Sequence, residues 1–270
     1  MIQGVAMKIG GRDAILQKVV FELRCRNGYT YLDSCGRTVN TIMREQPEWV
    51  LRSESASPQN APLLSLRNSC IFNFSSLKCD LSIERAPDKD PLGEKDVEVF
   101  AEQAENLHAI VADCLGLREF TRIGFRAWYI FGCSSSEDSE KWLLGLGCYQ
   151  IGTNLRSAFD NAEVESGSLS VVIVGEDRKF RIAFNGVELQ AQIDFGSGIL
   201  SVRPRDLPTD QHRVLLEQER VRQRMRQMPE FAAMIDIDAF QEEPLVVAPK
   251  DFITTSCREF LPRLQKACAH

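Results

Sequence analysis

Two aspartates on one predicted strand are the residues best placed for metal chemistry. Residues 235–240 (IDIDAF) alternate apolar and polar side chains, which predicts a strand with one buried face. Asp236 and Asp238 then point to one side, about 7 Å apart, a spacing at which two carboxylates can hold magnesium. The alternative is a solvated strand face. The same pattern at Asp80 and Glu84 favours that alternative.

A second group of candidate binding residues lies on the predicted strand 120–131. Arg122, Arg126 and Trp128 share one face of this strand, and Gly124 leaves room between them for a ligand to approach the backbone. Two cations beside an aromatic ring can bind a phosphate or a base. The alternative is that these arginines pair with Asp80 and Glu84 on neighbouring strands and help to set the register.

The segment 203–226 is the one strongly basic stretch of the sequence. It holds seven arginines and four acidic residues in a chain whose net charge is −6. Residues 210–228 are expected to form a helix with an apolar stripe. Its outward arginines could bind nucleic acid, with a steep salt dependence, or could form a solvated or protein-contacting face. The outward-facing candidates are Arg220, Arg222, Arg224 and Arg226.

Familiar catalytic motifs are missing from the sequence. There is no Gly-x-Ser-x-Gly, no P-loop and no Gly-x-Gly-x-x-Gly, and the three histidines lie outside strand-end motifs. The nine cysteines include no Cys-x-x-Cys pair, so we interpret them as reduced core thiols and expect neither zinc nor another cofactor. The sequence therefore leans away from an enzyme.

The elements that carry these residues suggest an internal duplication. Strand 79–84 and strand 235–240 each carry carboxylates, and each is followed by a linker and a helix that opens with Lys-Asp. These helices run from Lys95 towards Cys114 and from Lys250 towards Cys268. The first is strongly amphipathic and ends at Gly116.

The whole pattern predicts an α+β fold made of two similar halves, each an antiparallel sheet with packed helices. The expected halves are residues 1–152 and 153–270, packed as one unit. Short strands separated by turn residues, such as 169–174 and 179–184, indicate antiparallel meanders, with Asn185-Gly186 as a hairpin turn. Pro262 is expected to kink or interrupt the later part of the closing helix.

Composition limits the function classes further. At 270 residues and 44% hydrophobic content the chain can bury a sizeable core. Its apolar runs are too short to span a bilayer, and its first residues lack the pattern of a signal peptide, so we expect a cytoplasmic protein without a membrane partner. The acidic balance argues against a surface that binds nucleic acid everywhere, although a local basic patch can do so.

One resemblance rests on two of these segments. The strand Phe-Thr-Arg-Ile-Gly-Phe-Arg at 120–126, placed after a long helix, and the late Ile-Asp-Ile-Asp strand at 235–238 resemble a sporadically distributed bacterial family of similar length. The chain departs from that pattern at Ala127-Trp128. The resemblance implies the fold and the duplication, and it supplies no catalytic residue.

Three functional hypotheses follow. The first is a non-catalytic binding or assembly subunit, an accessory of antiviral defence that acts with an operon partner or as a homo-oligomer. The second is a metal-dependent phosphodiesterase or nuclease that uses Asp236 and Asp238, with Asp80 or Glu84. The third is nucleic-acid binding through the 203–226 segment without cleavage.

Overall fold

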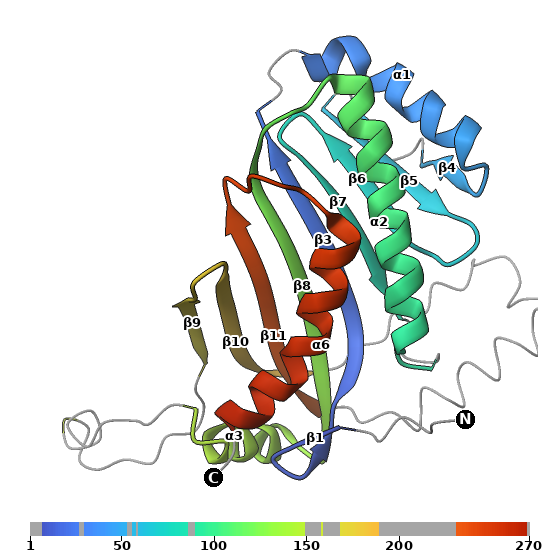
Figure 1. Cartoon of the computed structure of the whole chain (residues 1–270). Coiled ribbons are helices and arrows are strands. Elements are labelled where there is room, and N and C mark those ends of the chain that lie inside the picture. The colour runs from blue at the N-terminus through green and yellow to red at the C-terminus, as the bar shows by residue number, and fades with distance from the viewer. Residues whose placement is uncertain are drawn as a thin grey trace, which may run out of the picture.

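The fold is a large antiparallel sheet with helices across one face (Figure 1). A computed structural model describes residues 7–26, 30–52, 56–57, 59–85, 90–148, 158, 168–188 and 231–268. The helices are α1 (Thr30–Glu45), α2 (Glu94–Leu115), α3 (Ser136–Gly145) and α6 (Pro249–Ala267). The strands are β1 (Lys8–Ile9), β2 (Arg12–Asp13), β3 (Ile15–Cys25), β4 (Trp49–Leu51), β5 (Asn60–Ser65), β6 (Ile71–Ser75), β7 (Lys78–Glu84), β8 (Phe120–Cys133), β9 (Leu169–Val174), β10 (Lys179–Glu188) and β11 (Phe231–Glu242).

The predicted α+β class is confirmed, and the sheet is one continuous body. Its nine strands follow the order β4-β5-β6-β7-β3-β8-β11-β10-β9, and neighbouring strands are antiparallel. Strand β8 pairs with β3 on one side and with β11 on the other. The expected pair of separate sheets is therefore not found, and the expected boundary at 152/153 lies outside the described residues.

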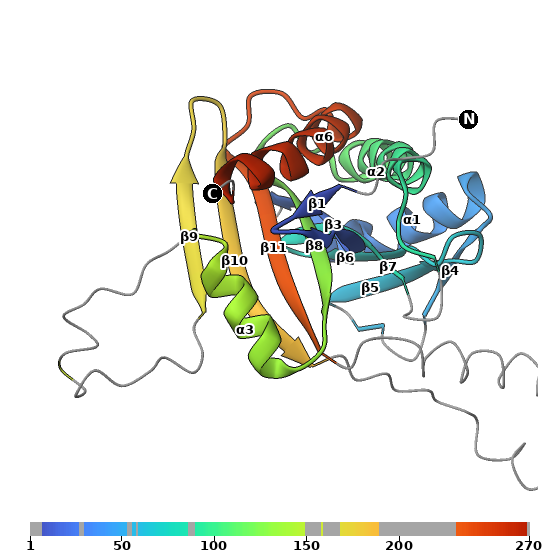
Figure 2. The ribbon, with the colours of Figure 1, turned by 90° about the horizontal axis from the view of Figure 1, so that it is seen from below.

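The two copies of the strand–helix unit lie on either side of the central strand pair β3–β8. Strand β7 flanks β3 and leads to α2, whereas β11 flanks β8 and leads to α6. The two helices pack against each other over the middle of the sheet (Figures 1 and 2). The central strand pair is thus flanked on each side by a strand that leads into a long helix. The duplication itself stays a prediction.

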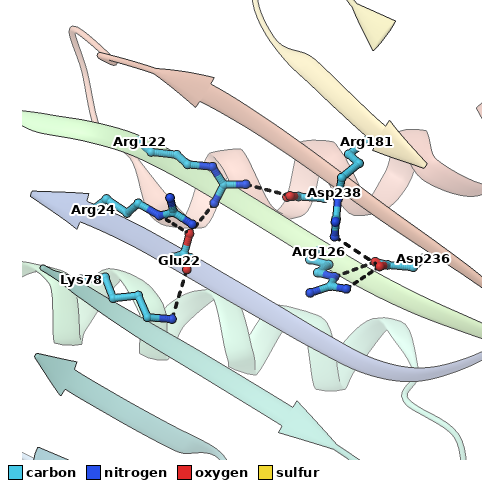
Figure 3. Close-up of polar contacts among 8 residues, drawn as sticks. All are labelled: Glu22, Arg24, Lys78, Arg122, Arg126, Arg181, Asp236 and Asp238. Atoms are coloured by element: carbon cyan, nitrogen blue, oxygen red, sulfur yellow. Dashed lines mark hydrogen bonds and ion pairs between the residues drawn. The ribbon is translucent and has the colours of Figure 1, made fainter. Parts of the chain in front are cut away.

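Alternation along the strands separates a buried face from a polar one, as the sequence of β8 predicts. Phe125 is fully buried and lies 6.5 Å from the ring of Phe100 in α2 and 5.6 Å from the ring of Phe260 in α6. Arg122 and Arg126 point to the opposite face, away from the described helices (Figure 3). The core therefore lies between the sheet and the helices, and the polar face is available for a site.

Gly186 shows why one predicted turn was wrong. Strand β10 continues through Asn185 and Gly186 and pairs Gly186 with Ala233 of β11. Helix α3 crosses the sheet at this point, so a Cβ on Gly186 would lie 2.5 Å from Glu140 Oε1 and 3.1 Å from Ser139 Oγ. The glycine permits a close approach of the helix, where the sequence pattern predicted a hairpin.

The ends of the two long helices follow local rules in part. In α2 the Asp96 carboxylate accepts a hydrogen bond from Gly93 N (2.9 Å), and Gly116 takes the left-handed conformation, as predicted. Helix α6 begins with Pro249 and continues past Pro262, so of the predicted kink or interruption the interruption is not found. Phe260 and Leu264, both fully buried, hold the helix on the sheet on either side of this proline.

The nine cysteines are free thiols, as expected, and four of them are buried core residues. The buried four are Cys25, Cys70, Cys79 and Cys133. Cys148 and Cys268 are neighbours, with 3.2 Å between their sulfur atoms, and join the segment after α3 to the end of α6. None of the described helices is both long and apolar enough to cross a membrane.

Candidate functional site

The two groups of candidate residues form one cluster on the polar face of the sheet. Arg122 and Arg126 come from β8, and Asp236 and Asp238 come from β11, the neighbouring strand. The register sets Asp238 opposite Arg126 and Asp236 opposite Trp128. Figure 3 shows these side chains together with partners from β3, β7 and β10. The sheet therefore unites residues that lie over 100 positions apart in the sequence.

Asp236 is the buried anchor of this cluster. Its Oδ1 accepts a hydrogen bond from Arg126 Nε at 2.6 Å, and its Oδ2 accepts bonds from Nη2 of Arg126 and from Nη2 of Arg181 (3.3 Å). The bond to Asp236 raises the pKa of Arg126, which therefore remains a cation. A bidentate arginine fixes both orientation and charge.

Arg122 joins β3 to β11 through two carboxylates. Its Nη1 donates to Glu22 Oε1 at 2.5 Å, and its Nη2 donates to Asp238 Oδ2 at 2.7 Å (Figure 3). Its guanidinium also lies over the ring of Phe240, 4.7 Å from the ring centroid. These contacts hold the Arg122 side chain flat against the sheet.

Glu22 forms ion pairs with three cationic side chains. Besides Arg122, it accepts hydrogen bonds from Arg24 Nε (2.8 Å) and Lys78 Nζ (3.2 Å). Burial alone would raise the pKa of Glu22, but the bond from Arg24 and the positive charges around it lower the pKa below the ordinary value of 4.5. Glu22 is therefore a carboxylate at neutral pH.

A pH prediction follows for Glu22→Gln. Because the folded pKa is lowered, the stabilisation from the charged form is present above pH 4.5 and is lost as the pH falls through the folded pKa. We expect Glu22→Gln to lower the free energy of unfolding by about 2 kcal/mol at neutral pH, because the three cations around Glu22 lose a charged partner. Urea unfolding should show the difference from wild type shrinking below pH 4.5. A difference that stays constant with pH would contradict this role.

Asp238 differs from Glu22 and Asp236 because one of its oxygens has no partner among the described residues. Oδ1 is buried and makes no hydrogen bond within the described part of the chain, whereas Oδ2 accepts from Arg122. Burial raises the pKa of Asp238, and this effect exceeds the opposing influence of Arg122, Arg181 and Arg126. A buried carboxylate oxygen without a donor is costly for the folded protein.

The partners that the sequence suggested for the arginines are wrong. Asp80 accepts from Asn73 Nδ2 (2.9 Å) and pairs with Lys78, and Glu84 pairs with Lys18 (2.7 Å). The reason is strand order, because β3 separates β7 from β8 and supplies Glu22 instead. Cross-strand pairing does occur, but with the carboxylates of β3 and β11.

The arrangement disfavours the metal site considered at Asp236 and Asp238. Arginines occupy Asp236 and one oxygen of Asp238, so a divalent cation would have to displace like charges to bind there. The described residues contain no group of three or more side chains suited to hold a metal ion. In this structure the two carboxylates accept hydrogen bonds from arginines.

A pocket of about 360 Å³ opens over this cluster. Arginines dominate its lining, and Glu22, Asp238 and Phe240 supply most of the rest. Gly124 forms part of the floor, but the Arg122 guanidinium fills the space above it, since a Cβ there would lie 2.8 Å from Arg122 Nη1. The room predicted at Gly124 thus holds a side chain of the protein. The four arginines that line the pocket are Arg24, Arg122, Arg126 and Arg181.

Trp128 lies beside the pocket and contributes to its wall only through Arg126. Lys18 Nζ lies 4.4 Å from the Trp128 ring centroid, and the Arg126 guanidinium carbon lies 5.2 Å from it. The indole Nε1 is buried and has no acceptor among the described residues. Trp128 therefore supports Arg126, and it does not line the pocket itself.

Besides Val20, sequence reasoning missed four residues that line the pocket. Arg181, Glu22, Arg24 and Phe240 all stand at alternate positions of predicted strands, on the side opposite the apolar residues. Their alternation was a usable signal of the exposed face. The basic candidates Arg220, Arg222, Arg224 and Arg226 lie outside the described residues.

No protein-family model, curated protein or solved structure matched the chain in the comparisons. The resemblance to a bacterial family therefore stays a prediction, and the site rests on its own geometry.

Proposed function

We propose that the protein is a non-catalytic binding subunit and that the arginine pocket is its ligand site, with an anion as the ligand. The observation that carries this proposal is a set of unused donors. Within the described residues, both Nη atoms of Arg24, Nη1 of Arg126, and Nε and Nη1 of Arg181 make no hydrogen bond. Guanidinium N–H groups are strong partners for phosphate and carboxylate.

The charge around the pocket supports an anion. Four arginines and two carboxylates line it, which leaves a net charge of +2, and counting Asp236 behind them still leaves +1. The whole chain has a net charge of −6, so this is a local reversal of sign. Such a reversal concentrates anions at the pocket.

The chemistry at the pocket supports binding over catalysis. Its acids are paired with arginines, and the described histidine, His108, belongs to α2 on the opposite face of the sheet. Burial lowers the pKa of His108, and its ring lies 5.3 Å from Phe120. We find no nucleophile and base in contact at the pocket among the described side chains.

The expected partnership remains part of this proposal. A binding subunit without its own reaction would act with a second protein, and we propose an operon partner in antiviral defence or a second copy of the chain. Co-purification from the native operon, followed by a mass measurement of the eluted particle, tests it. Elution as an isolated monomer with no retained partner would count against the assembly role.

The binding role is tested with Arg24→Gln and Arg181→Gln. Each change removes free donors and one positive charge, so we expect each to weaken sulfate binding about tenfold in calorimetric titrations at low salt. Arg263→Gln is the matched control, because Arg263 is an exposed arginine of α6 on the other side of the sheet. It should leave the affinity unchanged.

Failure of the wild-type protein to bind sulfate or phosphate would refute this function. Equal affinities in wild type and both pocket variants would show that any bound anion lies elsewhere. Thermal unfolding of each variant separates weaker binding from loss of the fold.

A further inference from the structure

The free oxygen of Asp238 adds a hydrogen-bond acceptor to a pocket rich in donors. Asp238 is 6% exposed, lines the pocket, and keeps Oδ1 without a partner in the described structure. A simple anion leaves this oxygen unpaired, because like charges repel. A ligand that also carries a donor removes the cost of the unpaired oxygen.

The pocket is wide enough for a ligand with two different ends. Its lining residues come from the four adjacent strands β3, β8, β11 and β10. Three strand spacings of about 4.8 Å each make about 14 Å from one side to the other. A volume of about 360 Å³ lies within the range of small-molecule sites.

The surroundings of Asp238 indicate what kind of donor suits it. Phe240 stands two residues further along the same strand and lines the pocket together with the Arg122 guanidinium, which lies over its ring, so two flat groups adjoin the acceptor. Aromatic rings of this kind stack with nucleobases. A carboxylate accepts hydrogen bonds from the amino and imino groups at base edges.

The flanking arginines explain how a ligand reaches the buried oxygen. Asp238 lies opposite Arg126 on one neighbouring strand and opposite Arg181 on the other. Both arginine side chains are more than one-third exposed, and Arg181 is held by Asp236 through a single bond of 3.3 Å. When the Arg181 guanidinium turns towards a bound phosphate, the space over Asp238 opens to the rest of the ligand, while Arg126 keeps Asp236 paired.

We propose that the ligand is a nucleoside monophosphate. Its phosphate binds the unused guanidinium groups, an amino or imino N–H of its base donates to Asp238 Oδ1, and the base lies against Phe240. A phosphate monoester carries a charge of about −1.5 to −2 near neutral pH, which matches the excess of arginines in the lining. This proposal rests on the proposed anion-binding function and adds the class of ligand.

Three probes separate this proposal from simple anion binding. Sulfate supplies charge alone, ribose 5-phosphate adds the sugar, and guanosine monophosphate adds a base with adjacent amino and imino donors. Calorimetric titrations at one pH and salt concentration should give an affinity at least tenfold higher for guanosine monophosphate than for ribose 5-phosphate. Equal affinities would overturn the nucleotide proposal while leaving anion binding intact, and no binding of any probe would refute both.

Asp238→Asn should change the affinities for sulfate and for guanosine monophosphate in different directions. The change removes a negative charge, so sulfate affinity should stay equal or rise. Guanosine monophosphate should lose at least tenfold in affinity, because the single amide oxygen is needed by Arg122 and an NH2 donor takes the place of Oδ1. Asp80→Asn, which removes a carboxylate from the same face outside the pocket, should show no such loss for guanosine monophosphate. A parallel change for both probes in Asp238→Asn would overturn the proposal.

A second variant covers the case in which Asp238→Asn fails to fold. Phe240→Leu keeps an apolar side chain and leaves the charged groups in place. It should weaken guanosine monophosphate binding severalfold and change sulfate binding much less, because Glu22 and Asp238 still hold Arg122 when the ring is lost. Unchanged nucleotide affinity in this variant would show that the base does not lie against Phe240 and would overturn the proposal.

Discussion

Asp236→Asn is expected to lower the free energy of unfolding by about 3–5 kcal/mol. Asp236 is 4% exposed and accepts hydrogen bonds from Arg126 and Arg181, so the change leaves two arginines without their shared counter-charge. Asparagine has nearly the same size, and the loss therefore reports charge and not packing. Urea unfolding at neutral pH and low salt measures it.

Two further variants make this expectation specific. Glu84→Gln removes a carboxylate from the same face, but Glu84 is about half exposed and, among the described residues, pairs only with Lys18, so the cost should stay below about 1 kcal/mol. The double variant Asp236→Asn with Arg126→Gln should cost less than the two single changes added together. Strict additivity would mean that the pair contributes no coupling.

Phe260→Ala is expected to cost about 3–5 kcal/mol of stability. Phe260 is fully buried in α6 and stacks on Phe125 of the central strand β8, with 5.6 Å between ring centroids. Its removal leaves a cavity between the helix layer and the middle of the sheet, where α2 and α6 meet. The midpoint of urea unfolding should fall accordingly.

Leu245→Ala is the control for this core variant. Leu245 is completely exposed, so the truncation should change the midpoint very little. If Phe260→Ala were as mild as Leu245→Ala, α6 would not be anchored through this ring. Ligand binding in Phe260→Ala at low temperature should persist, because the pocket residues project from the face of the sheet opposite the helices (Figure 3).

The sequence could predict the two faces of the sheet because alternation is a local property. The pattern around Phe125 separated apolar residues from Arg122 and Arg126 without any knowledge of the neighbours. The long helix α2 was equally accessible, since its period and its terminal glycine Gly116 are contained in one segment. These elements needed no information from distant parts of the chain.

The partners of the arginines required the strand order, which is not local. Arg122 meets Glu22 and Asp238, which lie 100 and 116 residues away along the chain. Nothing near Arg122 distinguishes these carboxylates from Asp80 or Glu84. The same limit explains the metal hypothesis, because two aspartates at alternate positions look alike whether a cation or an arginine faces them.

Glycine positions illustrate a further source of error. Gly186 next to Asn185 has the composition of a hairpin turn, yet it lies within β10 beneath α3. Gly124 was interpreted as space for a ligand, yet Arg122 folds over it. At Gly186, side chains of α3 occupy the space that a Cβ would need, and at Gly124 the side chain of Arg122 occupies it. Only the packed structure shows which side chain lies there.

The central position of β8 has a consequence for the order of folding. This strand pairs with β3, whose residues are made first, and with β11, whose residues are made about a hundred positions later. On the ribosome, Arg122 and Arg126 therefore emerge long before Asp236 and Asp238 can neutralise them. The pocket is complete only after β11 has been synthesised, because β11 lies between β8 and β10 and supplies Asp238 and Phe240. Pairings across such long separations are slow to form.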